Sequence, residues 1–222
     1  MQIAGWTKNS FLDFPGRIST VIFAPGCNFR CWYCHNEGIK DEGIQFSEIL
    51  QYLDRRKGLV DGVVFSGGEA TLQPDLLERM QEVKNRGFLV KLDTNGTNPK
   101  VLEKAIDEGL VDFVAMDIKA PKQKYEKITC CKVDLDAICK SIDILKQGRV
   151  DYEFRTTFSP DLLHQDIREI AQWIAGSKSY AIQQYRTETR NRTLLEKPHS
   201  PEYIRQAAEI ASAYVKTEIK GL

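Results

Sequence analysis

Six short apolar segments alternate along the chain with segments of helical periodicity, and this alternation limits the fold more than any other feature. The first apolar segment, ISTVIFA at residues 18–24, is rich in β-branched residues, as buried strands are. Residues 46–53 place apolar side chains at i, i+3, i+4 and i+7, the spacing of one helix face. We expect strands at 18–24, 61–66, 88–94, 113–120, 151–158 and 179–185, and helices at about 46–53, 75–86, 99–107, 135–142, 167–174 and 201–216.

This alternation predicts right-handed β–α–β units and a parallel sheet. A closed eightfold barrel typically needs about 250 residues, whereas this chain has 222 and shows six units. We therefore expect an α/β fold, a partial (β/α)6 barrel of parallel strands. Because no linker or internal repeat interrupts the sequence, residues 1–222 are expected to form a single domain.

The strand at 113–120 favours the barrel over an open, doubly wound sheet. Side chains alternate between the two faces of a strand, so Asp117 and Lys119 share one face and apolar residues fill the other. The strand at 151–158 repeats this pattern, with Arg155 on its polar face. A sheet that is apolar outside and charged inside suggests a curved sheet around a polar site, at the carboxyl ends of the strands.

The charge balance excludes some classes of function. Lys plus Arg and Asp plus Glu both number 31, so the formal net charge is zero. This argues against nucleic acid and acidic membranes as partners, because both attract surplus positive charge. The N-terminal segment has no basic region followed by an apolar run, so the protein is expected to be cytoplasmic. Thiols stay reduced there, which favours metal binding or catalysis for the six cysteines.

Three cysteines, Cys27, Cys31 and Cys34, follow the first strand in the sequence CNFRCWYCHN. A disulfide with one free thiol is disfavoured in a reducing compartment. A structural zinc site would need a fourth ligand, and His35 is awkwardly placed next to Cys34. The third alternative is a cubane iron–sulfur cluster, for which thiolates are the usual ligands. Three thiolates leave one iron open, as a reactive site requires.

A second motif, Ser66-Gly67-Gly68-Glu69, ends the second strand, where glycines permit close backbone approach. The pair CxxxCxxC and GGE is similar to the signature of the radical S-adenosylmethionine (SAM) superfamily, whose members have a partial (β/α)6 barrel. The stretches GCNFRCWYCHN, SGGEATLQ, DTNG and MDIKAP resemble the activating enzymes of glycyl radical enzymes. With the opening TKNSFLDFPGR, nearly the whole chain most resembles the activating proteins of anaerobic ribonucleoside-triphosphate reductase.

The resemblance implies a radical SAM oxidoreductase with one [4Fe–4S] cluster. Such activators cleave SAM reductively and use the 5′-deoxyadenosyl radical to take a hydrogen from a glycine Cα of a partner. The partner would be a glycyl radical enzyme, most closely anaerobic ribonucleotide reductase, and the electron donor a flavodoxin or ferredoxin. Alternatives are activation of a different glycyl radical enzyme, a small-molecule reaction like that of 7-carboxy-7-deazaguanine synthase, or a non-enzymatic iron–sulfur carrier or zinc scaffold.

The resemblance also implies site residues. Cys27, Cys31 and Cys34 would ligate three irons, and the SAM amino and carboxylate groups would chelate the fourth. Other positions would contact SAM: the backbone around Tyr33 and His35 the adenine, and Gly67, Gly68 and Glu69 the methionine amino group. The ribose and carboxylate would meet Asp93, Thr94, Asn95, Asp117 and Lys119, with a monovalent cation near Asp93 and Asp117 in some members.

Some candidates have simpler alternatives. Asp117 and Lys119 could form an ordinary ion pair at a strand end. Arg155 faces the same interior and could hold SAM or position the partner's glycyl loop. Gln184 and Arg186 are weak candidates for substrate contact, and His199 is a weak candidate for SAM contact. Further along the chain, Cys130, Cys131 and Cys139 are expected to bind no second cluster.

Overall fold

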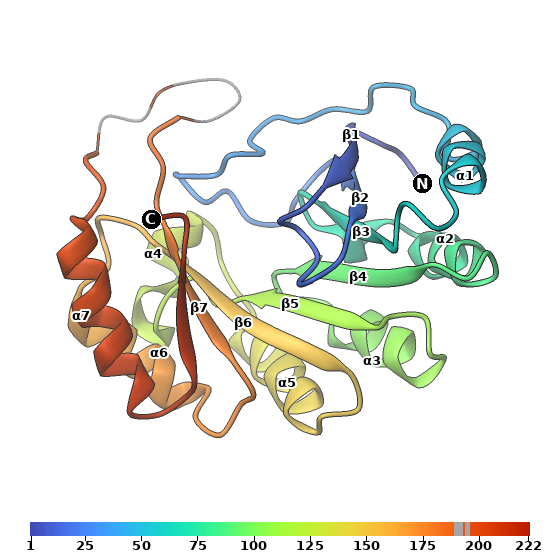
Figure 1. Ribbon diagram of the computed structural model, residues 1–222. Helices are drawn as coiled ribbons and strands as arrows, with labels where there is room; N and C mark the ends of the chain where they lie inside the picture. Colours follow the sequence, from blue (N-terminus) through green and yellow to red (C-terminus); the bar gives the residue numbers. More distant parts are fainter. Residues whose placement is uncertain (189–192, 194–195) are drawn as a thin grey trace.

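One mostly parallel, eight-stranded sheet organises the molecule (Figure 1). The structure, a computed structural model, describes residues 1–188, 193 and 196–222. The strands follow one another across the sheet in chain order: β1 Gly5–Ser10, β2 Ser19–Ala24, β3 Gly62–Gly67, β4 Leu89–Thr94, β5 Phe113–Asp117, β6 Asp151–Phe158, β7 Tyr180–Gln184 and β8 Thr217–Lys220. The α-helices are α1 Phe46–Arg55, α2 Leu76–Lys84, α3 Pro99–Asp107, α4 Tyr125–Thr129, α5 Leu135–Lys146, α6 His164–Trp173 and α7 Pro201–Ser212.

The sheet confirms the expected α/β fold and extends it at both edges. Strands β2 to β8 pair in parallel, and the six predicted strands are β2 to β7. Strand β1, which was not predicted, pairs antiparallel with β2, and β8 adds an unpredicted parallel edge beside β7. The short helix α4 was also missed, and α7 ends at Ser212, earlier than the expected residue 216.

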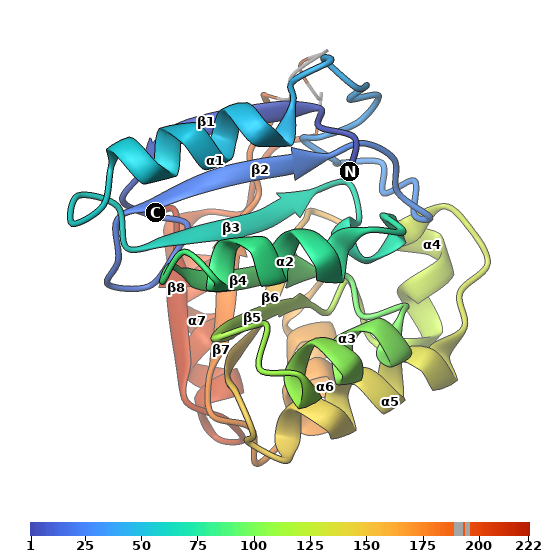
Figure 2. The same ribbon diagram turned by 90° about the vertical axis from the view of Figure 1, so that its right-hand side faces the viewer.

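The helices cover the outer face of the curved sheet (Figure 2). Local sequence sets where several of them begin: the Asp134 carboxylate accepts the Asp136 and Ala137 amides at the start of α5, and the Ser200 hydroxyl accepts the Tyr203 amide in α7. The main apolar core lies between these helices and the sheet. No helix in the described part of the chain is long and apolar enough to cross a membrane.

The inner face of the sheet is layered. A small apolar cluster of Phe14, Val21 and Val64, with Leu89 and Phe113 packed against it, lies at the amino ends of the strands. Because side chains alternate, the same faces carry polar and charged residues two or four positions further along. The sheet therefore has an apolar floor inside and a charged layer above it, at the carboxyl ends of the strands.

Candidate functional site

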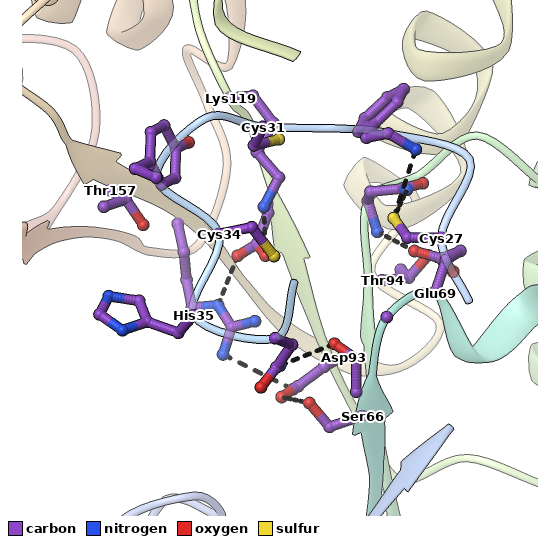
Figure 3. A pocket seen from close by; sticks show the side chains of 18 of the residues that line it. Cys27, Cys31, Cys34, His35, Ser66, Glu69, Asp93, Thr94, Lys119 and Thr157 are labelled. Carbon is purple, nitrogen blue, oxygen red and sulfur yellow. Dashed lines mark hydrogen bonds and ion pairs between the residues drawn. The ribbon is translucent and has the colours of Figure 1, made fainter. Parts of the chain in front are cut away.

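A cavity of about 240 Å³ lies at the carboxyl ends of the strands (Figure 3). All fourteen residues predicted for the site line it: Cys27, Cys31, Tyr33, Cys34, His35, Gly67, Gly68, Glu69, Asp93, Thr94, Asn95, Asp117, Lys119 and Arg155. Five further lining residues were not predicted: Phe29, Asn36, Ser66, Thr157 and Gln183. The sheet thus brings together the four sequence motifs, which lie on the cysteine loop and at the ends of β3, β4 and β5.

The loop that carries the cysteines is tied to the GGE segment by three hydrogen bonds. The Gly68 amide donates to the Ala24 carbonyl over 2.9 Å, and the Glu69 amide donates to the Gly26 carbonyl over 2.8 Å. At the far end of the cysteine loop, the Asn36 side-chain amide donates to the Gly67 carbonyl over 2.8 Å. These bonds hold the cysteines over the end of β3, as the loop crossing the strand ends in Figure 3 shows.

The Glu69 carboxylate is buried, with 1% of the residue exposed, and is held by the β4 end. Its Oε1 accepts the Thr94 hydroxyl at 2.7 Å and the Thr71 hydroxyl at 2.6 Å, and its Oε2 accepts the Asn95 amide at 2.6 Å. Burial raises the pKa of Glu69, and these donors counteract the rise. A fixed acceptor-only group therefore faces the cavity, and it suits a cationic donor such as an ammonium group.

A row of alternating charges crosses the cavity floor from β4 to β6. The Arg155 guanidinium donates from Nε to Asp117 Oδ1 over 2.8 Å, and its Nη1 lies 3.6 Å from Asp93 Oδ1. Lys119 Nζ donates to Asp117 Oδ2 over 2.9 Å. The pKa of Lys119 and that of Arg155 lie above their usual values because the carboxylates outweigh the effect of burial. All four groups are thus charged, and the row can receive a further carboxylate at its cationic end.

Comparison with known proteins decides the family. The Radical SAM superfamily model matches residues 21–174, more than half of the chain. The chain belongs to the radical SAM superfamily. A protein of Methanocaldococcus jannaschii, provisionally named a glycyl-radical enzyme activating enzyme, is 37% identical over 96% of this chain and 92% of its own length. The pyruvate formate-lyase-activating enzyme of Clostridium pasteurianum is 37% identical over 49% of this chain and 48% of its own.

The solved structures agree on the fold. SuiB of Streptococcus suis, in a crystal structure with bound S-adenosylmethionine, superposes with a TM-score of 0.71 at 14% identity. The superposition covers 88% of this chain and 48% of SuiB. At this identity the likeness concerns the fold, and it places this chain's sheet among the partial barrels of radical SAM enzymes. The family implies a [4Fe–4S] cluster and SAM as cofactors, and the cavity can be tested for both.

The three radical SAM cysteines suit a metal cluster. All six cysteines of the chain are free thiols. Burial raises the pKa of the Cys31 thiol to about 12 and also raises that of Cys27, although the nearby charge of Lys119 lowers both, so forming the thiolates requires further positive charge. Bound metal supplies that charge. All three cysteines line the cavity. Within the described residues, no three His, Cys, Asp or Glu side chains form a group that could hold a single metal ion.

An unpaired polar atom also points to a ligand in this cavity. Tyr33 is 4% exposed, and its hydroxyl has no hydrogen-bond partner among the described residues. A buried hydroxyl without a partner is costly and calls for a ligand or water. Beside it, His35 is half-buried, and burial lowers the pKa of its imidazole, which favours the neutral ring. The cavity wall at these two residues therefore suits a neutral, polar group such as a nucleobase.

Strand alternation places Gln183, and not Gln184, in the cavity lining. Gln183, opposite Thr157 in the parallel pairing of β7 with β6, lines the cavity. Gln184, the weak candidate for substrate contact, lies on the other face of β7, and its side-chain amide donates to the Tyr185 carbonyl over 3.2 Å. His199 lies outside the described cavity lining as well, and its ring packs on Phe158 with centroids 4.4 Å apart.

The cysteines outside the triplet are also separate from the cavity lining. Cys139 is half-buried on α5, and Cys130 is exposed at the end of α4. Cys131 packs under the cysteine loop, with its thiol 3.5 Å from the Asn28 carbonyl.

The charge row predicts a pH-dependent stability. Burial alone would raise the pKa of Asp117, but Arg155 and Lys119 lower it from 3.8 to about 2. A lowered carboxyl pKa stabilises the fold above pH 3.8, and this contribution is lost as the pH falls through about 2. Asp117→Asn should therefore lower the free energy of unfolding by up to about 2 kcal/mol at neutral pH. A quarter of the side chain is exposed, so this is an upper value.

Urea unfolding of the wild type and Asp117→Asn, both without cofactors, checks this from pH 7 down to pH 2. The difference between them should be constant above about pH 4 and shrink towards pH 2. A difference that grows on acidification would contradict the assignment. Asp151→Asn, at an exposed carboxylate paired with Lys178, serves as the control and should change little.

Proposed function

We propose that this chain is the activating enzyme of a glycyl radical enzyme and that residues 1–222 act as one radical SAM domain. The observation that carries the proposal is the match, over 96% of the chain, to a relative named for this activity. The partial match to a pyruvate formate-lyase-activating enzyme supports it further. The cavity adds the second support, because it unites the cysteine triplet with the polar groups that SAM would need.

When bound, the cluster and SAM would supply the chemistry: reductive cleavage of the sulfonium and abstraction of a hydrogen atom from glycine Cα. The chain's residues bind, orient and exclude water. Cys27, Cys31 and Cys34 would hold the cluster. The Glu69 carboxylate and the backbone of Gly67 and Gly68 would accept the methionine amino group.

The remaining cavity residues would orient the two ends of SAM. Lys119, at one end of the charge row, and Arg155, between the two carboxylates, would pair with the methionine carboxylate. Asp93, Thr94 and Asn95, at the end of β4, would contact the ribose. The wall at Tyr33 and His35 would contact the adenine, which would give the unpaired Tyr33 hydroxyl a partner.

The partner that fits the sequence motifs best is anaerobic ribonucleoside-triphosphate reductase. A flavodoxin or ferredoxin would deliver the electron, and the protein would work in the cytoplasm, with neither nucleic acid nor membrane as partner.

Glycyl radical formation tests the proposal. The protein is reconstituted anaerobically with iron and sulfide, then incubated with SAM, dithionite and the reductase of the same organism. We expect the doublet of a glycyl radical by electron paramagnetic resonance, together with 5′-deoxyadenosine. A reductase whose radical-bearing glycine is replaced by alanine is the control and should give no doublet.

Each other outcome favours a different function. A doublet with pyruvate formate-lyase instead of the reductase would identify another glycyl radical enzyme as the partner. Formation of 5′-deoxyadenosine without a doublet on either enzyme would favour a small-molecule reaction. Absence of 5′-deoxyadenosine from the cluster-loaded protein would overturn the enzymatic assignment.

A further inference from the structure

Lys91 is a charged residue in the interior of the barrel that does not line the cavity. It lies on β4 two residues before Asp93, so both side chains point to the inner face. Its side chain is 1% exposed, and its ammonium group forms an ion pair with Asp93 Oδ1. Lysines are almost never fully buried unless they are paired. The burial of a charged ammonium group below the cofactor cavity therefore needs a physical explanation.

Together, Lys91 and its neighbours occupy every oxygen of the two carboxylates. Asp93 Oδ1 contacts Lys91 and Arg155, and Asp93 Oδ2 accepts the Ser66 hydroxyl over 2.9 Å. Asp117 Oδ1 accepts from Arg155, and Asp117 Oδ2 accepts from Lys119. Alkali cations are bound through oxygen ligands. A cation added here would have to displace a donor or lie beside a positive charge.

The charge count leads to the same conclusion. Two carboxylates face three cationic side chains, so the row carries one net positive charge. One added carboxylate, such as that of the SAM methionine, would neutralise it. Glu153, two residues before Arg155, is paired with Lys220 over 2.6 Å, and its charge also stabilises the cations Lys91 and Arg155. Because the charges of Glu153 and Lys220 offset each other, the net count stays at one positive charge. A metal cation would restore an unbalanced charge in a buried site, which is unfavourable.

The pKa of Asp93 is consistent with an ionised pair. Burial alone would raise this pKa, but the charges of Arg155 and Lys91 lower it below its usual range. Burial also lowers the pKa of Lys91, and the charge of Asp93 opposes that fall. Asp93 is therefore a carboxylate at neutral pH, and it is the ion-pair partner of the Lys91 ammonium group.

We propose that the Lys91 ammonium takes the place of a monovalent metal ion, so that this radical SAM site binds SAM without Na⁺ or K⁺. An ammonium group carries the same single charge as these ions and, like them, is satisfied by oxygen atoms. Arg155 completes the arrangement by bridging the two carboxylates. The inference rests on the proposed placement of SAM in this cavity, and it replaces the predicted monovalent cation near Asp93 and Asp117.

Cation dependence of the wild type is the first test. The affinity of the cluster-loaded protein for SAM is measured in KCl, NaCl and tetramethylammonium chloride at equal ionic strength. We expect the three dissociation constants to agree within about twofold, since no site for a metal cation remains. Thallium(I), a K⁺ substitute seen directly by NMR, should show no specific binding to the protein. Specific thallium binding, or a loss of SAM affinity of about fivefold or more without K⁺ and Na⁺, would overturn the proposal.

The substitution Lys91→Met is the second test, because it removes the charge and keeps much of the volume. In tetramethylammonium chloride, SAM affinity should fall at least about tenfold, since Asp93 loses its nearest cation. K⁺ or Na⁺ should recover part of the loss and produce thallium binding, whereas Lys91→Arg should stay independent of metal cations. The role of Lys91 would be contradicted if K⁺ or Na⁺ did not restore SAM affinity in Lys91→Met, or if these ions raised the SAM affinity of the wild type equally.

Two controls separate the possible failures. Lys178→Met removes an exposed lysine paired with Asp151 and should leave SAM affinity unchanged in every salt. If Lys91→Met does not fold, the thallium and SAM measurements on the wild type decide the question alone. Failure of the proposed function would appear differently, as wild-type protein that binds SAM in none of the three salts. The thallium experiment needs no SAM, so it would still test whether the site binds a monovalent cation.

Discussion

Replacing Cys31 by alanine is expected to abolish the formation of 5′-deoxyadenosine, with a fall of more than about 100-fold. Mutation of residues that merely support metal ligands already costs 10- to 100-fold, and loss of a ligand should exceed this. Cys31 is 8% exposed and lines the cavity, so a thiol from solvent cannot take its place. The variant should retain less iron and lose the visible absorption of the cluster.

The variant should nevertheless fold, because the change from cysteine to alanine removes a single sulfur atom from the core. The loss of stability is expected to be about 1 kcal/mol, and circular dichroism checks that the fold is intact. Cys139→Ala is the matched control: Cys139 lies half-buried on α5, outside the described cavity lining, and its iron content and activity should match the wild type. Wild-type iron content and 5′-deoxyadenosine in Cys31→Ala would refute the ligand role.

The six inner strands could be predicted because short runs with strand-like apolar residues recur between segments of helical periodicity, the first at residues 18–24 preceding the first helix. The edges could not be predicted in the same way. Strand β1, GWTKNS, is half-exposed and polar, and its structure depends on pairing with β2 rather than on burial. Strand β8 has four residues, two of them charged, and follows directly on α7. The apparent continuation of α7 to residue 216 thus hid the turn into β8.

The candidate site was predictable because its residues belong to motifs at strand ends, and strand ends meet in a parallel sheet. The motifs did not predict the charged residues that lie below the cavity, inside the barrel. Lys91 belongs to no recognisable motif, and a lysine in a strand is ordinarily expected at the surface. Its position two residues before Asp93 was the available signal, because it fixes both side chains on the inner face. Similarly, alternation along β7 would have favoured Gln183 over Gln184.

Asn36 shows a different limit of sequence reasoning. It closes the cysteine loop onto Gly67, 31 positions away, and no local pattern indicates such a contact. The same is true of the ladder formed by Asn95, Asn28 and Thr97, in which Asn95 donates to Asn28 over 2.9 Å and Asn28 donates to Thr97 over 2.8 Å. These contacts join loops that are distant in sequence, so they depend on the completed fold.

Gly68→Ala is expected to separate the two motifs from each other. A Cβ on Gly68 would lie 1.9 Å from the Gly26 carbonyl oxygen and 2.5 Å from its carbon. These are backbone atoms, and they are held there because Gly26 accepts the Glu69 amide over 2.8 Å. Relief of the clash therefore requires the cysteine loop to move away from β3. We expect a loss of unfolding free energy of about 3 kcal/mol or more, at the upper end for overpacked sites.

Cofactor binding should weaken together with the stability of the fold, because the displaced loop carries the cysteines. Urea unfolding of the protein without cofactors measures the stability, and iron content with SAM affinity measures the site; SAM affinity should fall at least about tenfold. Gly5→Ala is the matched control, since its added Cβ would meet the Phe23 ring at an ordinary 3.6 Å, and its stability should change by less than about 1 kcal/mol. Wild-type stability and SAM affinity in Gly68→Ala would mean that the cysteine loop and the GGE segment do not need their close backbone contact. The joint loss expected instead follows from one geometric fact: the backbone that presents Glu69 to the cavity is also the backbone on which the cysteine loop rests.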